Sequence, residues 1–423
     1  MTLRRIIALV LASSTASLGL AGCGDDPVPV TDSGVTDSGT SDTGVADAGA
    51  DVPVTPADVP TVDSGSALVL TAALSGRQVV PPAYTSAATG TVTFTLSPDR
   101  ALLSYTITHT VLVPLTTRLY LGLAGEAGTM LLSLTNNGGT TIGTTGLTAD
   151  QARAILEGRT YVNITSAGFP EGELRGQIVQ PGEVVYTAQL SGDQENPPVT
   201  TASRGVAEFL VDTTANRLRF AVHVTGMTMA ATASHIHTGT AGINGGVLID
   251  LSDPGPVPSG DYIGTRSITG PSVADLEAGR WYINVHSAGF PAGEIRGQIL
   301  RPAERLYIAR MNGMEELPPV TTMAAGTLGV IVGANRDTLT YDGVVTGVTP
   351  TAAHLHRGAL GVGGDVVTPL MFTGMTLRST GPVPASAALL MGLETREIYA
   401  NVHSAQHPGG EVRGQLNPAP SMP

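Results

Sequence analysis

Glu294-Ile295-Arg296-Gly297-Gln298-Ile299 is the stretch that decides the fold, because the chain carries it three times. Its copies are Glu173-Leu174-Arg175-Gly176-Gln177-Ile178 and Glu411-Val412-Arg413-Gly414-Gln415-Leu416. Well upstream of each copy stands a proline pair, at Pro81-Pro82, Pro197-Pro198 and Pro318-Pro319. Repeats of about 115 residues are whole domains rather than turns of a solenoid. We therefore divide this part of the chain into domain 1 (67–180), domain 2 (184–301) and domain 3 (305–417).

Within each domain, apolar and polar residues alternate in short runs such as 90–96, 218–224 and 339–345. A period of two predicts strands with one buried face, and the Gly, Pro and Asp residues between the runs predict turns. Many such strands in about 115 residues are typical of a β-sandwich. The predicted fold class is all-β, with three tandem antiparallel β-sandwiches of the Greek-key, immunoglobulin- or superoxide-dismutase-like type.

A short helix of one or two turns is expected in each domain, before the strand that precedes the repeated close. In domain 1, Thr148 and Gln151 have the spacing of a capping box, and Gly158 is placed to end the helix. In domain 2, Ser272 and Gly279 are expected to play the same two parts.

The N-terminus has the features of an export signal. Arg4 and Arg5 precede the apolar stretch 6–20, which is too short to span a bilayer comfortably. The stretch ends in Leu-Ala-Gly-Cys at 20–23, which resembles the lipobox of bacterial lipoprotein signal peptides. That resemblance implies cleavage of a signal peptide (1–22) and lipidation of Cys23, so that the lipid anchors the chain to a membrane.

A spacer (23–66) separates this anchor from domain 1. Residues 24–66 contain nine Asp and no Lys or Arg, and large apolar side chains are almost absent. Such a segment cannot bury enough apolar surface to become ordered, so we expect a disordered linker. The net charge of −13 argues against a nucleic-acid partner. Gly24, rather than Asp, follows the lipobox cysteine and favours the outer membrane, on its periplasmic face or at the cell surface.

Two further motifs accompany the repeated close in domains 2 and 3. One is His-x-His-x-Gly, at 235–239 and 354–358, and the other is Asn-Val-His-Ser-Ala, at 284–288 and 401–405. Together with Glu-x-Arg-Gly-Gln they resemble the CHRD domain, a family named from chordin, over nearly all of residues 68–416. The resemblance implies an all-β extracytoplasmic module. We expect a lipid-anchored cell-envelope protein that binds another protein or an envelope component.

The histidines also suggest a metal site. Residues i and i+2 of a strand point to the same face, so His235 and His237 project together, and Asn284 and His286 do the same. If the two strands are neighbours, three imidazoles converge, and three nitrogen ligands with an open position suit copper or zinc. The candidate ligands are His235, His237 and His286 in domain 2 and His354, His356 and His403 in domain 3.

Other residues of the repeated motifs are candidates for supporting these ligands. The second nitrogen of each ring is expected to bond a carbonyl or a carboxylate that fixes the ring, with Glu294 and Glu411 as the candidate carboxylates. The structural candidates are Asn284, Asn401, Arg296 and Arg413.

Domain 1 provides an internal comparison. It has Arg118, Tyr120 and Thr165 at the three histidine positions, yet it keeps the Asn and the Glu-x-Arg-Gly-Gln close. The histidines are therefore separable from the scaffold, which is compatible with a metal site and equally with packed histidines in two domains. Copper–zinc superoxide dismutases also place an H-x-H on a β-sandwich, but no bridging histidine, zinc subsite or disulfide is evident here. The sequence contains none of the usual local motifs of hydrolases or nucleotide-binding enzymes.

Overall fold

The computed structural model describes residues 66–81, 83, 85–227, 229–252, 261–268 and 270–419 of the 423 in the chain. The expected signal peptide, Cys23 and residues 23–65 of the expected spacer lie outside the described residues. None of the described helices is both long and apolar enough to cross a membrane.

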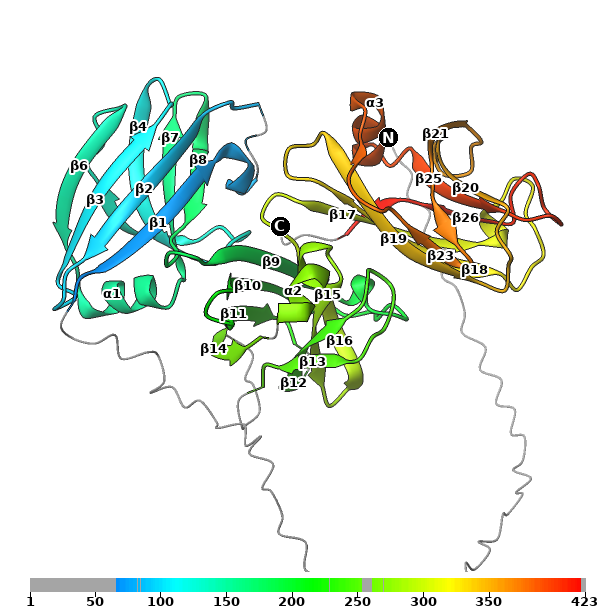
Figure 1. Cartoon of the computed structure of the whole chain (residues 1–423), viewed down its shortest axis with the longest axis horizontal. Helices are drawn as coiled ribbons and strands as arrows, with labels where there is room; N and C mark the ends of the chain where they lie inside the picture. The colour runs from blue at the N-terminus through cyan, green and yellow to red at the C-terminus, as the bar shows by residue number, and fades with distance from the viewer. Residues whose placement is uncertain are drawn as a thin grey trace, which may run out of the picture. The chain divides into compact units, whose positions relative to one another are not determined.

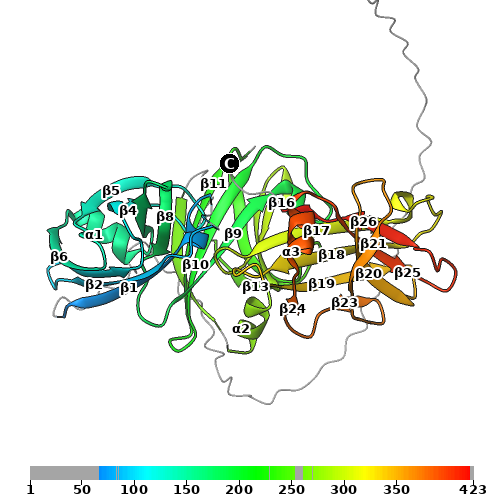
Figure 2. The ribbon, with the colours of Figure 1, turned by 90° about the horizontal axis from the view of Figure 1, so that it is seen from above.

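Domain 1 forms an antiparallel sheet in the order β5-β4-β7-β8-β1-β2-β3-β6. Figures 1 and 2 show β1, β2, β3 and β6 on one side of the domain and β4, β7 and β8 on the other. The elements are β1 (Leu68–Ser75), η2 (Gly76–Gln78), β2 (Thr89–Leu96), β3 (Leu102–His109), β4 (Pro114–Leu121), β5 (Thr129–Leu134), β6 (Thr140–Gly146), α1 (Ala149–Leu156), β7 (Thr160–Ser166) and β8 (Phe169–Gln177).

Domain 2 repeats this arrangement, in the order β13-β12-β15-β16-β9-β10-β11-β14. Its elements are β9 (Val184–Ser191), η3 (Gly192–Gln194), β10 (Arg204–Asp212), β11 (Arg217–Thr225), β12 (Ala231–Thr238), β13 (Val247–Asp250), β14 (Asp261–Ser267), α2 (Gly270–Glu277), β15 (Trp281–Ser287) and β16 (Phe290–Gln298).

Domain 3 follows the same order, β21-β20-β25-β26-β17-β18-β19-β23-β22, with β24 paired to β19 and β27 to β17. Its elements are β17 (Arg305–Asn312), η4 (Gly313–Glu315), β18 (Ala325–Val332), β19 (Thr338–Thr346), β20 (Ala352–Arg357), β21 (Asp365–Pro369), β22 (Phe372–Thr373), β23 (Thr376–Arg378), β24 (Val383–Pro384), α3 (Ala387–Glu394), β25 (Ile398–His403), β26 (Val412–Gln415) and β27 (Asn417–Pro418). The predicted all-β class with three tandem antiparallel domains is confirmed.

Each domain has its own hydrophobic core between the two halves of its sheet. In domain 2 the alternate residues Ile236, Ile283, Val285 and Ile295 are fully buried and belong to one cluster with Trp281. Because side chains alternate along a strand, the residues between them, including His235, Asn284 and Arg296, lie on the opposite, outer face of the sheet. Domains 1 and 3 contain the corresponding clusters around Phe94 and Leu355. The histidines are thus outside the apolar core.

The helix predictions were right in domain 1 and partly wrong in domain 2. The side chain of Thr148 accepts a hydrogen bond from the backbone N–H of Gln151, and the Gln151 side chain completes the capping box. Gly158 and Gly279 follow their helices with positive φ, at 79° and 66°, as expected for the residue after a helix end. Ser272, however, lies inside α2, which begins at Gly270.

Candidate metal centre

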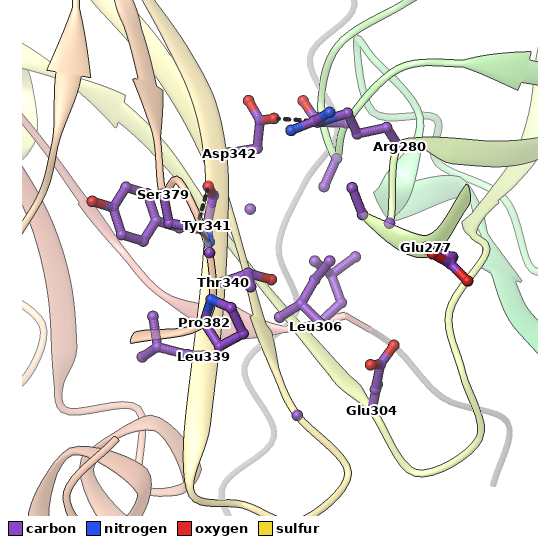
Figure 3. Close-up of a pocket in the computed structure, with 18 of the residues that line it drawn as sticks. Glu277, Arg280, Glu304, Leu306, Leu339, Thr340, Tyr341, Asp342, Ser379 and Pro382 are labelled. Carbon is purple, nitrogen blue, oxygen red and sulfur yellow. Dashed lines mark hydrogen bonds and ion pairs between the residues drawn. The ribbon is translucent and has the colours of Figure 1, made fainter. Parts of the chain in front are cut away.

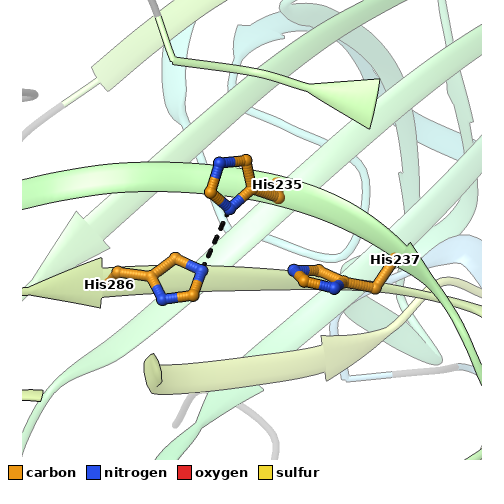
Figure 4. Close-up of side chains that lie close together, drawn as sticks. All are labelled: His235, His237 and His286. Carbon is orange, nitrogen blue, oxygen red and sulfur yellow. Dashed lines mark hydrogen bonds between the residues drawn. The ribbon is translucent and has the colours of Figure 1, made fainter. Parts of the chain in front are cut away.

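The two strands that carry the histidines are neighbours in domain 2. β12 pairs with β15 so that His235 is opposite Asn284 and His237 is opposite Tyr282, while Ala233 is opposite His286. The three imidazoles therefore project from adjacent strands onto one face, and Figure 4 shows their rings turned towards one another. One ligand atom from each ring lies within 4.8 Å of the other two. The expected convergence of the three rings is thus present in the fold.

The nitrogens of these rings are divided into two sets. Nδ1 of His237 bonds the carbonyl oxygen of Gly245 at 3.1 Å, and Nδ1 of His286 bonds that of Pro291 at 3.1 Å. A carbonyl only accepts, so both Nδ1 atoms carry the proton and both Nε2 atoms present a lone pair. Nε2 of His286 lies 3.1 Å from Nδ1 of His235. Nε2 of His237 is buried and has no hydrogen-bond partner among the described residues.

Domain 3 reproduces this geometry. Nδ1 of His354 is 3.2 Å from Nε2 of His403, and the Nδ1 atoms of His356 and His403 bond the carbonyl oxygens of Gly364 and Pro408 at 3.0 Å. Nε2 of His356 is again buried and without a partner among the described residues. The corresponding nitrogens of the three rings therefore have the same arrangement in both histidine-bearing domains.

This donor set suits a transition-metal ion. Nitrogen ligands at about 2.0–2.1 Å from a tetrahedral ion lie about 3.4 Å from one another. The candidate ligand atoms lie within 4.8 Å of one another, so they would have to approach by up to about 1.4 Å to hold an ion. Burial lowers the pKa of His237 and of His286, and burial likewise lowers the pKa of His354 and of His403. Lower pKa values keep these rings neutral at pH 7, the form that binds a metal. The residues present therefore fit copper or zinc.

A stack of three side chains supports one ligand of each site. The ring of His237 is stacked on Tyr282, with centroids 4.9 Å apart and planes inclined by 8°. On the other side of that tyrosine, the guanidinium carbon of Arg296 lies 3.4 Å from the ring centroid. His356, Tyr399 and Arg413 form the same stack. The arginine also bonds two carbonyls of the turn after the H-x-H strand, those of Thr240 and Ile243 in domain 2.

Arg296, in the Glu-x-Arg-Gly-Gln close, thus fixes the turn whose Gly245 carbonyl bonds His237. The glutamine of the same motif also contacts this turn. Nε2 of Gln298 donates to the carbonyl oxygens of Gly239 and Gly279, which ties this turn to the end of α2. Carbonyl oxygens, one of the two expected kinds of partner, bond Nδ1 of two ligands in each site. The candidate carboxylates Glu294 and Glu411 bond other groups. Glu294 accepts from Ser203, Thr201 and Ser287, and Glu411 accepts from Thr322. These glutamates fasten the last strands to the segment before β10 or β18.

Domain 1 keeps the scaffold and replaces the site. Tyr120 takes the place of the stacked histidine and lies on Tyr161, with ring centroids 5.2 Å apart and planes inclined by 7°. Arg175 lies over the other face of Tyr161 at 3.5 Å and bonds the carbonyls of Leu123 and Glu126. Where His286 would stand, the hydroxyl of Thr165 bonds that of Thr116 at 2.7 Å.

Two other features are not part of these sites. His407 is absent from the group formed by His354, His356 and His403, and its backbone closes the turn with Ser404. A cavity of about 400 Å³ is lined by residues in and around α2, β17, β18 and β19, among them Glu277, Arg280, Tyr341 and Asp342. It contains the ion pair of Arg280 with Asp342, at 3.1 Å, and no histidine (Figure 3).

A family model for the CHRD domain matches residues 70–178, 186–299 and 307–416, one match in each of the three domains. The chain belongs to the CHRD domain family. The resemblance inferred from the sequence motifs is thereby confirmed, and the chain is a tandem array of three CHRD domains. No curated protein and no solved structure gives a significant match to it.

One pair of residues near the sites escaped the sequence interpretation. In the two histidine-bearing CHRD domains, Glu195 and Glu316 follow the 3₁₀ turns η3 and η4, directly before the x-Pro-Pro element. Their carboxylates accept hydrogen bonds from Asn284 and Asn401. Domain 1 has Val79 at this position. Alignment of the three repeats shows this difference, with Glu in domains 2 and 3 and Val in domain 1. The position is far from the histidine motifs along the chain, so the sequence does not connect the two.

Proposed function

We propose that this CHRD protein is a lipid-anchored metal-binding protein of the bacterial cell envelope, with one copper or zinc ion held by domain 2 and one by domain 3. One observation carries the proposal. In both domains three ring nitrogens face one point, while carbonyls occupy the other nitrogen of two rings and one buried Nε2 has no partner among the described residues. Buried polar atoms without partners are rare. An ion at this point would give a partner to Nε2 of His237 in domain 2 and to Nε2 of His356 in domain 3.

Three neutral imidazoles leave a position of the ion open to water or another ligand. When bound, the ion would supply a Lewis acid, or a one-electron centre if it is copper. The chain's own residues would hold the ion in a fixed geometry. The carbonyls of Gly245 and Pro291 fix the tautomers of His237 and His286, and the Tyr282–Arg296 stack fixes the plane of the first ring. Such a site suits metal storage, sensing or delivery at the envelope.

The first test is metal content. The chain from residue 24 onward, loaded with Cu²⁺ or Zn²⁺ and desalted, is expected to retain about two ions per chain, since two sites have the ligand number for these metals. His237→Ala and His356→Ala should each remove one ion, and the double variant should remove both. His407→Ala is the matched control, because His407 lies in domain 3 outside the ligand group, and it should leave both ions in place. Retention below about 0.2 ions per chain by the unmodified protein contradicts the proposal.

The anchor has a separate test. The cysteine of a lipobox is acylated after export. Cells given a labelled fatty acid should therefore transfer the label to the wild-type chain and not to a Cys23→Ser variant. Fractionation should find the wild type in membranes, and in outer membranes if Gly24 acts as expected. A chain that is unlabelled, and that leaves the membrane fraction at low salt, would contradict lipid anchoring without affecting the metal sites.

A further inference from the structure

The buried glutamates of domains 2 and 3 vary together with the histidines. Both domains with the three-histidine set have a glutamate directly before the x-Pro-Pro element, Glu195 or Glu316, and domain 1 has Val79 there. The asparagine they contact does not vary, because domain 1 retains it as Asn163. In domain 1 the amide of Asn163 donates to the backbone oxygen of Glu171 at 2.8 Å, and Asn284 makes the corresponding but longer contact with the oxygen of Ala292, at 3.5 Å. The asparagine is thus part of the shared scaffold, whereas the glutamate accompanies the histidines.

The glutamates reach the ligand strand through this asparagine. Nδ2 of Asn284 donates to Oε2 of Glu195 at 3.4 Å, and Nδ2 of Asn401 donates to Oε2 of Glu316 at 3.2 Å. Asn284 lies opposite His235 in the strand pairing and two residues before His286 on β15. It therefore shares the outer face with the ligands and is flanked by two of them. Each carboxylate is held directly behind a residue that adjoins the proposed ion.

The carboxylates are placed where a negative charge is unfavourable in the absence of a cation. Glu195 and Glu316 are 95% buried, with 5% of their surface exposed. Oε1 of each has no hydrogen-bond partner among the described residues, and Oδ1 of Asn284 and of Asn401 also has none. Burial raises the pKa of Glu195 and of Glu316 to about 7, although Arg296 and Arg413 oppose the shift. A buried acid with so few partners needs another reason to be there.

The neighbouring arginine does not supply that reason. Arg175 of domain 1 stacks on its tyrosine and bonds the carbonyls of Leu123 and Glu126, although domain 1 has Val79 where domain 2 has the glutamate. Arg175 is buried like Arg296, at 3% exposed against 1%, and its neighbouring acids are Glu208 and Glu126 rather than a glutamate at the position of Val79. The fold therefore accommodates the buried arginine without an acid in this position. What distinguishes the domains with the acid is the histidine set.

We propose that Glu195 and Glu316 are positioning residues of the two metal sites, which add a buried negative charge behind Asn284 and Asn401 and so select a divalent ion over a monovalent one. This inference rests on the proposed metal-binding function. Three histidines form a neutral ligand set, so the glutamate would supply the buried compensating charge for an M²⁺ ion, whereas Asp250, near His235 in domain 2, is exposed to solvent. A carboxylate in a poorly solvated place interacts with a dication more strongly than with Cu⁺. The glutamate is thus expected to set the preference between Cu²⁺ or Zn²⁺ and Cu⁺.

The test uses Glu195→Gln in a His356→Ala background, which leaves only the domain 2 site, and Glu316→Gln in a His237→Ala background. Affinities for Zn²⁺, Cu²⁺ and, without oxygen, Cu⁺ are measured at pH 8 by competition with chromophoric chelators. The affinity for both divalent ions should fall about 10–100-fold, the usual effect of losing a residue that supports metal ligands. The affinity for Cu⁺ should change by less than about threefold. Glu304→Gln, which neutralises a carboxylate at the joint after domain 2, is the matched control and should change neither.

Thermal unfolding of the metal-free variants separates this role from a purely structural one. Because the substitution removes a buried charge, the melting temperature at pH 8 should stay the same or rise. Divalent affinity that is unchanged within about twofold overturns the inference, and so does an equal loss for Cu⁺ accompanied by a lower melting temperature. If the wild-type chain holds two ions and the glutamine variants bind equally well, only this inference fails. If the wild-type chain binds no ion, the proposed function fails as well.

Discussion

Domain 1 and domain 2 share a scaffold and differ in what its outer face carries. Both have the Arg–Tyr stack, the buried asparagine and the glutamine that ties the turn to the helix end. In domain 1 the stack ends in Tyr120, and two threonines pair where domain 2 has His286. The comparison teaches that the CHRD framework folds without its histidines and without its buried glutamate. These residues are therefore candidates for function, while the framework explains the fold.

The strongest way to break this comparison is to give domain 1 the residues that it lacks. The set Val79→Glu, Arg118→His, Tyr120→His, Thr165→His, with Thr116→Ala, should raise the metal content of the chain by one ion, because the supporting carbonyls and stack are already in place. The same set without Val79→Glu should bind the added divalent ion about 10–100-fold more weakly. Equilibrium dialysis with metal analysis measures both. A grafted, folded domain 1 that takes up no ion would show that the difference involves more than these positions.

A glycine shared by the domains should have the next largest effect. Gly172 and Gly293 have φ of 149° and 133°, where a Cβ would lie 2.3 Å from Oδ1 of Asn163 and 2.4 Å from the Asn284 amide. Replacing either by Ala should cost about 3 kcal/mol of unfolding free energy, from strain and displacement of the asparagine. Only Gly293→Ala should also lower metal content. Chemical denaturation measures the cost, and Gly168→Ala, with nothing within 4 Å of its Cβ position, is the control. Equal stability of all three variants would contradict the packing described.

The pH dependence of stability should distinguish domains 2 and 3 from domain 1. Because the pKa of Glu195 and of Glu316 is raised from 4.5 to about 7, the folded state binds more protons than the unfolded state between these values. Stability therefore falls as pH rises through this window, by about 2–3 kcal/mol per glutamate as an order of magnitude. The metal-free double variant Glu195→Gln, Glu316→Gln should lack this loss, so its advantage over the wild type grows from pH 5 to pH 8.

The histidines with lowered pKa act in the opposite sense, since the folded state binds fewer protons than the unfolded state just below pH 6.5. These histidines are present in the wild type and in the Glu195→Gln, Glu316→Gln variant alike. The difference in unfolding free energy between the two proteins therefore reports on the glutamates alone. A difference that stays constant between pH 5 and pH 8 would show that these carboxylates are not proton-linked to folding. Val79→Ala in domain 1 is a useful reference, because it changes stability without adding a titrating group.

The smallest expected effect sharpens the comparison of domain 2 with domain 3. Asp250 lies opposite His235, with its carboxylate 3.9 Å from Nε2, whereas Pro369 lies opposite His354. His235 would hold an ion through Nδ1 with its proton on Nε2, and the carboxylate of Asp250 would stabilise that tautomer. Asp250→Asn should weaken the domain 2 site by about threefold at low salt, and by less at 0.5 M salt, because the carboxylate is exposed and therefore screened. An effect that does not depend on salt would point to a different role.

The strands of the fold and the candidate ligands of the site could be predicted from patterns along the chain. Alternating residues predicted the strands, and the i, i+2 spacing placed His235 with His237 and Asn284 with His286 on common faces. The supporting groups could not be predicted in this way. The acceptors for Nδ1 are carbonyls, which every residue has, so no residue type announces Gly245 or Pro291. Glu294 was a candidate for that role because of its spacing, and it bonds hydroxyls of a segment about 90 residues away.

The three repeats, the all-β class and the residues that separate domains 2 and 3 from domain 1 can all be read from the chain alone, because they depend on local periodicity and repeated motifs. The pairing of β12 with β15, and the contact between Glu195 in the loop after β9 and Asn284, are known from the folded chain alone. Both depend on contacts between segments about 50 and 90 residues apart. Such contacts are determined by the packing of the whole domain, since burial of the shared core brings these segments together and no local pattern encodes their distance.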